Sequence, residues 1–542
     1  MTSFHHGESI SSWMETIEMP TFAPLASDID VDVCIVGGGL AGLTTAYMLL
    51  QAGRKVCVLE GYEIGSGQTS RTTAQCTYAL DERYFKLEKY HGEKGTRLAA
   101  ESHESAITKV AEIIKKENID CELEKVNGYL FCADDIKADY TLKSNREKCH
   151  EYLNKELDAI LKAGLLDVYM TERIPLDSFD PGPAICFPDQ LQLNPLKYLN
   201  GLAECIIKKG GQIFTNSHVT EVKGGENAYV RLQNNHIVTC GSVVVTTNCP
   251  FNDLVTIHTK QASYRSYVIG LEIPPASMIK GLYWDTEDPY HYVRLLKKDG
   301  RGNEMLLVGG EDHKTGQKDN PEHCYTKLEN WARKRFPNAG RVFYRWSGHI
   351  LKPVDGLAYI GKNPMDEDNV YIITGHSGNG MTYSTIGAML ITDQIMGKKN
   401  PWENLYNPSR ISLSSAGNYI KENANTLAQY KDWFTEPLYD EVEHNIPGEG
   451  VVFRDGLQII AAYKDFHGNL ELNSAVCPHL GGIIHWNTAE KTWDCPCHGS
   501  SFDCHGKVIK GPANVDLSPV ERPAMHPPDT IKIWETPDAT PT

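Results

Sequence analysis

Two short segments near the C-terminal end of the chain each combine cysteine with histidine. They read Cys477-Pro478-His479 and Cys495-Pro496-Cys497-His498, and fifteen residues, 480 to 494, lie between them. Two thiolates and two imidazoles are the ligands of a 2Fe-2S cluster in which two cysteines hold one iron and two histidines hold the other. A structural zinc site uses the same ligand types, but it normally groups cysteine with cysteine and histidine with histidine. Because each loop here mixes the two, the spacing favours an iron-sulfur cluster over zinc. The expected ligands are Cys477, His479, Cys495 and His498.

The residues that follow these ligands resemble the Rieske domains. Gly499-Ser500-Ser501-Phe502 continues the second loop as that family does, and Gly511-Pro512-Ala513 is similar to the proline loop that covers the cluster. The respiratory members join an additional cysteine of each loop in a disulfide. This chain has Cys497 but Gly482 at the two positions, so that crosslink is absent.

A second departure bears on the redox potential. The respiratory members place a tyrosine hydroxyl near the cluster, where this chain has Phe502. Hydrogen bonds to cluster sulfurs raise the potential, and Ser500 can donate one whereas Phe502 cannot. We therefore expect a potential in the lower part of the Rieske range, which is about −150 to +300 mV. The histidine-ligated iron is expected near the surface, as the exit for electrons.

The N-terminal part of the chain carries a dinucleotide-binding fingerprint. A short apolar run, Val31–Val36, leads into Gly37-x-Gly39-x-x-Gly42 and a helical segment, and a second strand ends at Glu60, eighteen residues after Gly42. In this pattern the first glycine allows the tight turn, the second lets the pyrophosphate approach the backbone, and the third lets helix and strand pack closely. The pyrophosphate then lies at the positive end of the helix. Glu60 can bind both ribose hydroxyls.

Three later segments resemble the D-amino-acid-oxidase superfamily and indicate FAD rather than NAD. They are the strand, glycine turn and helix from Val370 to Ile395, the segment Asp355–Gly361, and the strand Val243–Asn248. Only one dinucleotide fingerprint occurs, whereas an NAD-reducing flavoenzyme would normally show two. The resemblance implies that Gly378, Gly380 and Met381 begin a helix whose N-terminus faces the flavin and stabilises negative charge on the reduced ring.

A narrower resemblance is to fused flavin–Rieske oxidoreductases. It is carried by Gly65–Gln75 and Gly309–Gly316. It implies that Thr72 and Thr73 lie by the pyrophosphate and flavin, and that Val219 meets the adenine side through its backbone.

Composition and length agree with a chain of several domains. The chain has 542 residues and a formal net charge of −17, without a run rich in lysine or arginine, which argues against nucleic acid as a partner. We expect no membrane span and no secretory signal, hence a cytoplasmic protein, with organelle import left open. Apart from the cluster ligands, the fifteen cysteines are expected to be free thiols of a reducing compartment.

The expected fold is an α/β (α+β) FAD-binding Rossmann-like domain with an inserted substrate domain, followed by an all-β Rieske domain. Residues 1–27 are interpreted as a loosely ordered lead-in, and 28–400 as the FAD-binding domain, with insertions at about 81–190 and 260–345. A linker at 401–436 then leads to the Rieske domain at 437–536.

A missing arginine bears on the identity of the substrate. Amino-acid oxidases of the superfamily often read W-S-G-x-R-P, with the arginine clamping the substrate carboxylate, but Trp346–Leu351 has Ile350 at that position. An apolar side chain cannot replace a bidentate guanidinium. A simple α-amino acid is thus in doubt unless Arg265 or Arg294 performs the task. The candidate catalytic residues are Tyr292, Arg294 and His313, with His376 as a further pocket candidate, although packed tyrosines on a solvated strand explain the pattern equally well.

Two cofactors of this kind predict a dehydrogenase. It would oxidise a small amine-type C–N substrate on FAD and pass electrons singly through the cluster to an external one-electron carrier. The alternatives are a reductase running in the reverse direction, an electron-transfer adaptor without a substrate, and an oxidase that uses dioxygen. An oxygenase is disfavoured because no pair of histidines with a nearby acid stands out as a mononuclear iron site.

Overall fold

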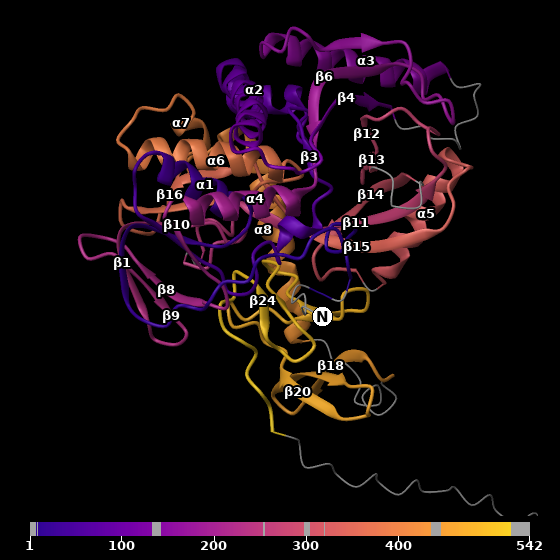
Figure 1. The fold of residues 1–542 in the computed structure, drawn as a ribbon. Coiled ribbons are helices and arrows are strands. Elements are labelled where there is room, and N and C mark those ends of the chain that lie inside the picture. Colours follow the sequence, from indigo (N-terminus) through magenta and orange to yellow (C-terminus); the bar gives the residue numbers. More distant parts are fainter. Residues whose placement is uncertain are drawn as a thin grey trace, which may run out of the picture.

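The computed structural model describes residues 7, 9–132, 143–252, 255–296, 304–318, 320–434 and 446–521. Figure 1 shows two large sheets with their helices side by side, and a β-rich C-terminal domain below them. No helix in these residue ranges is both long enough and apolar enough to cross a membrane.

The first sheet is mixed, with a parallel centre. Its strands are β1 (Ile29–Val36), β2 (Val56–Leu59), β7 (Gln212–Phe214), β8 (Val219–Lys223), β9 (Tyr229–Leu232), β10 (Ile237–Val245), β16 (Tyr359–Lys362) and β17 (Val370–Thr374). The order is β16-β17-β10-β1-β2-β7, with β16 antiparallel at the edge and the β8–β9 hairpin attached to β10. Strands buried on both faces have continuous apolar runs, as the second half of β1 does.

Three helices cover one face of this sheet: α1 (Leu40–Gln51), α4 (Pro195–Lys208) and α6 (Gly380–Ile395). Side chains of β1 and α1, such as Ile35 and Leu43, share one buried core with α6. The N-terminus of α1 and that of α6 are thereby brought to the carboxyl ends of the parallel strands, which is where open α/β sheets bind ligands.

The second sheet comes from the insertions. Its strands are β3 (Gln75–Cys76), β4 (Glu124–Phe131), β5 (Tyr169–Thr171), β6 (Ala184–Gln192), β11 (Gln261–Ile273), β12 (Leu282–Trp284), β13 (His291–Leu296), β14 (Glu304–Lys314) and β15 (Val342–Pro353), in the order β15-β11-β14-β13-β12-β4-β6-β3 with β5 beside β6. Helix α5 (Glu322–Arg335) packs on β11 and β14, α2 (Tyr84–Glu117) contacts α6, and α3 (Lys143–Lys162) contacts α2 and β6. The sheet therefore forms a wall beside the first domain.

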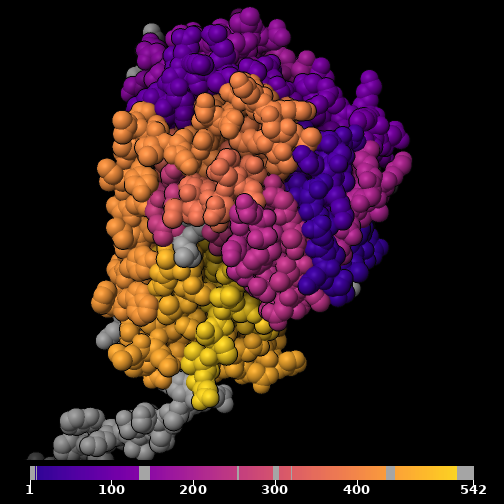
Figure 2. All heavy atoms as spheres, turned by 90° about the vertical axis from the view of Figure 1, so that its left-hand side faces the viewer, coloured from indigo at the N-terminus to yellow at the C-terminus, as the bar shows by residue number. Residues whose placement is uncertain are grey.

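A connecting segment leads to the C-terminal domain. It contains α7 (Glu403–Tyr406), η2 (Leu413–Ser415), α8 (Ala416–Gln429) and η3 (Tyr430–Trp433), whereas η1 (Gln68–Arg71) lies early in the chain. The domain itself has a three-stranded sheet, β18 (Glu449–Asp455), β19 (Gln458–Lys464) and β20 (Leu470–Ser474), and a four-stranded sheet, β21 (His485–Asn487), β22 (Thr492–Asp494), β23 (Ser501–Phe502) and β24 (Val508–Lys510). Figure 2 shows its orange and yellow atoms packed directly against the rest of the chain.

The fold class is the expected one, an α/β (α+β) domain with a β-rich C-terminal domain. Helix α2 has a kink at Gly92, where φ is 69°. Asn216, with a φ of 49°, separates β7 from β8. Residues 435–445 and 522–536 of the expected linker and Rieske domain lie outside the described residues.

Two expectations from composition were wrong. In the described part of the lead-in, Trp13 is 2% exposed, and its indole donates to the carbonyl of Thr72, so this segment is packed rather than loosely ordered. Cys132 and Cys149 are joined as a disulfide, with their Cα atoms 6.1 Å apart, so these two cysteines are not free thiols.

Candidate functional site

The glycine turn after β1 has the geometry that a pyrophosphate requires. Gly37 has a φ of 114°, a conformation that favours glycine. A Cβ at Gly42 would overlap the carbonyl oxygen of Gly37, so only glycine lets α1 pack this closely on the turn. Gly39 is the N-cap of α1 and supplies no side-chain cap, while the N–H of Leu40 donates to the hydroxyl of Thr69 at 3.1 Å.

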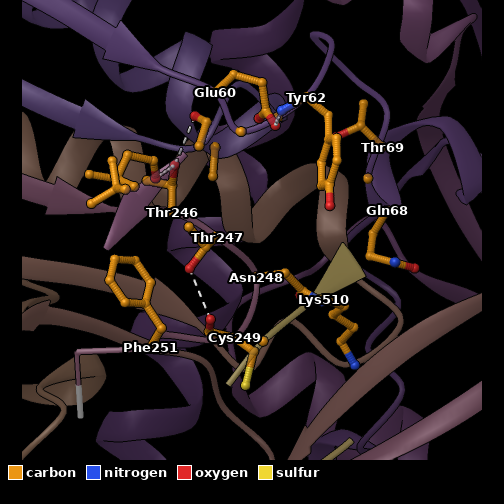
Figure 3. Close-up of a pocket in the computed structure, with 18 of the residues that line it drawn as sticks. Glu60, Tyr62, Gln68, Thr69, Thr246, Thr247, Asn248, Cys249, Phe251 and Lys510 are labelled. Carbon is orange, nitrogen blue, oxygen red and sulfur yellow. Dashed lines mark hydrogen bonds between the residues drawn. The ribbon is translucent and has the colours of Figure 1, made fainter. Parts of the chain in front are cut away.

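Glu60 lies at the end of β2, beside this turn. Its carboxylate accepts hydrogen bonds from the backbone N–H of Gly38 at 2.6 Å and of Tyr62 at 2.9 Å, and burial raises its pKa. These bonds fix the carboxylate at the rim of a cavity of about 200 Å³. Figure 3 shows Glu60 and Thr246 on one side of this cavity and Cys249 and Lys510 on the other.

The first cavity is lined by four of the residues expected to bind FAD and by a segment that was not expected. Gly37, Gly39, Glu60 and Val219 line it, whereas Gly42 packs against Gly37. Part of the opposite wall is Val508–Asn514 of the C-terminal domain. There the hydroxyl of Tyr62 donates to the carbonyl of Val508, and the imidazole of His218 lies 3.1 Å from the carbonyl of Asn514.

A second cavity, of about 140 Å³, shares Gln68, Asn248 and His376 with the first. Thr72, Thr73, Gly378 and Gly380 line it, as the resemblance implies for residues at the flavin, whereas Met381 is buried in the core. The other walls come from the second sheet, including its edge strand β15. The second cavity therefore lies between the first domain and the second sheet.

Of the three candidate catalytic residues, the structure brings only Tyr292 to this cavity. Arg294 lies behind it and donates to the carbonyls of Thr73, Ala74 and Leu193 at 2.5, 2.9 and 3.3 Å, while burial lowers its pKa to about 9. Ala74 has a φ of 53°, so Arg294 holds a strained turn rather than a substrate.

His313 lies on the other side of the sheet, near α5. Its imidazole contacts the hydroxyl of Tyr267 and the carbonyl of Lys314, each at 2.9 Å, and burial lowers its pKa to about 4. Neither contact reaches the second cavity. His313 is therefore no longer a candidate for contact with the substrate.

Arg265, the other possible carboxylate clamp, is also engaged elsewhere. Its guanidinium donates to Asp494 and Ser347, each at 2.8 Å. The strand β15 presents Ile350 to the cavity, so the position of the usual arginine is apolar. His376 lines both cavities, and burial lowers its pKa to about 4.

Sequence reasoning missed Asp81. Its carboxylate lines the second cavity and accepts hydrogen bonds from the N–H of Gly378 at 2.6 Å, the hydroxyl of Ser377 at 3.1 Å and the hydroxyl of Tyr290 at 3.1 Å. One N–H that the resemblance assigns to the flavin is thus already bound to a side chain. No motif marks Asp81, because its partners lie more than two hundred residues away in the sequence.

The four expected cluster ligands come together in two matching loops. A backbone hydrogen bond to the cysteine closes each loop. The N–H of Gly481 donates to the carbonyl of Cys477 at 2.9 Å, and the N–H of Gly499 donates to the carbonyl of Cys495 at 3.0 Å. Both glycines have positive φ, 74° and 80°. The loops therefore present their ligands in the same way.

The two cysteines lie next to each other, and so do the two histidines, as a cluster with two differently ligated irons requires. The thiols of Cys477 and Cys495 lie in hydrogen-bonding contact, and the imidazole rings of His479 and His498 are 5.0 Å apart, centre to centre. Two sulfurs on one side and two nitrogens on the other fit a 2Fe-2S cluster with two differently ligated irons. These four residues would hold it.

The surroundings of the cysteines agree with the expectations from the loop sequences. The hydroxyl of Ser500 contacts the sulfur of Cys477 and accepts from the N–H of Ala513 at 3.0 Å. Phe502 is buried and offers no hydrogen-bond donor from its side chain. A Cβ at Gly482 would lie 2.6 Å from the sulfur of Cys497, so Cys497 packs against the glycine.

The two ligand histidines are half-buried, and a histidine of the first domain packs against both of them. The ring of His258, which belongs to the first domain and is buried, lies 4.9 Å from that of His479 and 6.0 Å from that of His498. The sulfur of Cys249 lies 3.8 Å from the Nδ1 of His258, and Cys249 lines the first cavity. A chain of contacts thus joins that cavity to the cluster ligands.

The two ligand loops differ in burial. Pro478 and Leu480 at the tip of the first loop are exposed, although the hydroxyl of Tyr430 and the indole of Trp433 cover its backbone. Pro496 in the second loop is buried, and its carbonyl accepts from Gln317 at 3.2 Å.

Buried ion pairs fix the C-terminal domain to the rest of the chain. Arg71 pairs with Glu490 at 3.2 Å, and Arg265 pairs with Asp494 at 2.8 Å, with all four side chains at most 3% exposed. The hydroxyl of Ser9 also donates to Glu490. This explains why the N-terminal segment is ordered.

Comparisons with known proteins agree with both halves of this geometry. Residues 32–394 match the family model described as FAD dependent oxidoreductase, and residues 433–521 match that of the Rieske [2Fe-2S] domain. The chain is 31% identical over 512 residues to a putative Rieske 2Fe-2S iron-sulfur protein, YhfW, of Bacillus subtilis, which covers 94% of this chain and 97% of the relative. It is 28% identical to the gamma-glutamylputrescine oxidoreductase of Escherichia coli over 69% of this chain and 86% of that protein. The crystal structure of glycine oxidase from Geobacillus kaustophilus has the same fold over 71% of this chain and 99% of its own, with a TM-score of 0.56 and 16% identity.

Proposed function

Because this chain belongs to the FAD-dependent oxidoreductases and carries a Rieske 2Fe-2S domain, we propose that it oxidises a carbon–nitrogen bond of a small amine and passes the electrons singly to an external carrier. The family matches confirm FAD and the 2Fe-2S cluster as its cofactors. The direction of electron flow, the external carrier and the roles of individual residues are part of the proposal.

The observation that carries the proposal is the contact between the two cofactor sites. The histidine ligands of the cluster pack on His258, and His258 contacts Cys249 in the wall of the first cavity. A domain that received no electrons from the flavin would have no reason to pack its ligand histidines against the FAD domain. The arrangement suits electron exchange within one chain.

Each cofactor supplies one kind of chemistry. FAD supplies two-electron oxidation of the substrate, and the cluster supplies one-electron transfer. The residues of the chain would hold both groups. The glycine turn at Gly37 and Gly39, together with Glu60, would hold the dinucleotide, and Thr72 and Thr73 would lie at the flavin.

An amine-type substrate is supported by the relatives and by the cavity. The named relative from Escherichia coli is a gamma-glutamylputrescine oxidoreductase, and the solved structures with this fold include a glycine oxidase. The second cavity has Ile350 rather than an arginine on β15, and Arg265 is bound to Asp494. A substrate held mainly by its carboxylate is therefore not the best fit.

Anaerobic stopped-flow absorbance of the holoprotein, mixed with amines that bleach the flavin, tests the order of events. We expect the flavin absorbance to fall first and the cluster absorbance second. His258→Leu should slow only the second phase, because it removes the ring between Cys249 and the two ligand histidines. A matched control is His485→Gln, since His485 is a partly exposed histidine of the Rieske domain that bonds to Asp432.

The outcomes separate the alternatives. Reduction of the cluster before the flavin would indicate the reverse direction. Failure of every amine, together with normal electron exchange after photoreduction, would indicate an adaptor. An unchanged second phase in His258→Leu, with intact cluster absorbance and potential, would exclude the contact as the route.

A further inference from the structure

The second cavity has an aromatic wall with one acid beside it, and we propose that this is a binding site for a cationic, N-alkylated ammonium substrate without a carboxylate. The wall consists of Trp284, Tyr290 and Tyr292, and the acid is Asp81. The proposal rests on the proposed function and names its substrate class.

The sheet holds the aromatic rings in place. Trp284 of β12 and Tyr292 of β13 are directly opposite each other in the antiparallel pair, so both rings stand on the same face. The rings of Tyr290 and Tyr292 are 5.7 Å apart, centre to centre. Three rings that line one cavity can surround a cationic head group, which is attracted to the faces of aromatic rings.

Two glycines let the rings lie against the sheet. A Cβ at Gly309 would overlap the ring of Tyr292, and one at Gly128 would lie 2.5 Å from the ring of Trp284. Hydrogen bonds fix the ring edges, from the indole of Trp284 to Gln75 at 2.7 Å and between the hydroxyls of Tyr292 and Ser266 at 3.1 Å. The wall is therefore preformed rather than assembled by the ligand.

Asp81 adds a fixed negative charge. Tyr290, a member of the wall, donates to one carboxylate oxygen, while Ser377 and the N–H of Gly378 donate to the other. These are neutral donors, so they orient the carboxylate without cancelling its charge. A cation in the cavity would meet Asp81 together with the aromatic rings.

The basic side chains around this cavity are already engaged with groups of the chain. Arg71 pairs with Glu490 and Arg265 with Asp494, Lys352 pairs with Asp312 at 3.1 Å, and Arg83 and Arg294 donate to backbone carbonyls. Lys352 and Arg83 also interact electrostatically with Asp81. A substrate carboxylate would thus have to compete with internal acceptors for these cations, of which only the Nε atoms of Arg71, Arg265 and Arg294 have no hydrogen-bond partner among the described residues. An ammonium group would not enter this competition.

Isothermal titration calorimetry of the holoprotein tests this without turnover. The probes are choline and its neutral isostere 3,3-dimethylbutan-1-ol, with acetate as the carboxylate probe. Choline should bind more tightly than the neutral alcohol, and acetate should not compete with it. Flavin absorbance, measured in the same titration, should change on binding because the cavity also contains Thr72 and Thr73.

Three variants separate charge from ring contacts. Asp81→Asn keeps the shape and removes the charge, so it should weaken choline but not the alcohol. Trp284→Leu should weaken choline by roughly 2- to 30-fold, the range for loss of one ring–cation contact. Asp368→Asn is the control for net charge, since Asp368 is an exposed acid at the far edge of the first domain.

Equal affinities for choline and the alcohol, no binding of choline, or tighter binding of acetate would each overturn the proposal. If Trp284→Leu lost its FAD, Gly309→Ala would replace it, because the added methyl group displaces the ring of Tyr292. A failure here leaves the electron transfer between flavin and cluster untouched, and that transfer is measured separately by stopped flow.

Discussion

Replacing Glu490 by glutamine should loosen the Rieske domain from the FAD domain while both remain folded. The Glu490 side chain is 0% exposed and accepts from Arg71 at 3.2 Å, from the hydroxyl of Ser9 at 2.7 Å and from the N–H of Ser347 at 3.0 Å. Glutamine has the same shape, but it leaves the buried guanidinium of Arg71 without its counter-charge.

The magnitude follows from the burial of the pair. Removing one partner of a buried ion pair costs about 3–5 kcal/mol, because the other charge stays desolvated. Since 1.4 kcal/mol is a tenfold change, the docking equilibrium should shift by roughly two to three and a half powers of ten. Replacing both residues, as Arg71→Met with Glu490→Met, should cost less than the sum of the two single changes.

Two measurements report the docking equilibrium. Limited proteolysis of the connecting segment should accelerate in proportion to the undocked population, and small-angle X-ray scattering should show a larger radius of gyration. Glu471→Gln is the matched control, because Glu471 forms an exposed pair with His505 and exposed pairs contribute little. Cleavage and scattering identical to those of the wild type would refute the view that this buried pair holds the domain in place.

Three further predictions concern the two cofactor sites and the second sheet. Gly42→Val should abolish FAD binding, measured by the flavin absorbance of the purified protein, because even a Cβ there overlaps the Gly37 carbonyl; normal flavin content would contradict the pyrophosphate turn. Cys477→Ser should remove the cluster absorbance and leave bound FAD, whereas loss of both would show that the domains do not fold independently. Burial lowers the pKa of His291, but the hydrogen bond to Asp285 and the nearby carboxylate of Glu311 outweigh it and raise that pKa to about 9. The stability that this raised pKa contributes is fully present below about pH 6.5 and is lost as pH rises through 9, by about 3 kcal/mol at most. The melting temperature should therefore fall over this range in the wild type, and a parallel fall in His291→Gln would disprove the assignment.

Both cofactor sites were predictable because their determinants are local in sequence. The turn at Gly37 and Gly42 is set by the steric needs of a few neighbouring residues, and the cluster loops place their ligands within two or three residues of one another. Short motifs of this kind predict the same local structure in different proteins. The expected role of each residue toward FAD remains a prediction.

The other features of the cavities and of the domain interface depend on contacts between segments that are distant in sequence. Such contacts produce no recognisable pattern in the sequence. Asp81 meets Tyr290 across 209 positions of sequence, and Arg71 meets Glu490 across 419. Arg294 alternates with Tyr292 along β13 as a pocket residue would, yet its longer side chain ends at the carbonyls of Thr73 and Ala74. Alternation predicts which face a side chain occupies, but not how far along that face a cavity extends.

The unequal burial of the two ligand loops gives the cluster an inner and an outer approach. The loop of His498 is enclosed by the FAD domain, while the exposed tip of the other loop, Pro478 and Leu480, remains in contact with solvent. A docked carrier protein would therefore meet the cluster beside His479. Electrons from the inner side, where His258 packs on both ligand histidines, and electrons that leave at the exposed loop tip would then cross different sides of one cluster. The Rieske domain would not have to move between two positions.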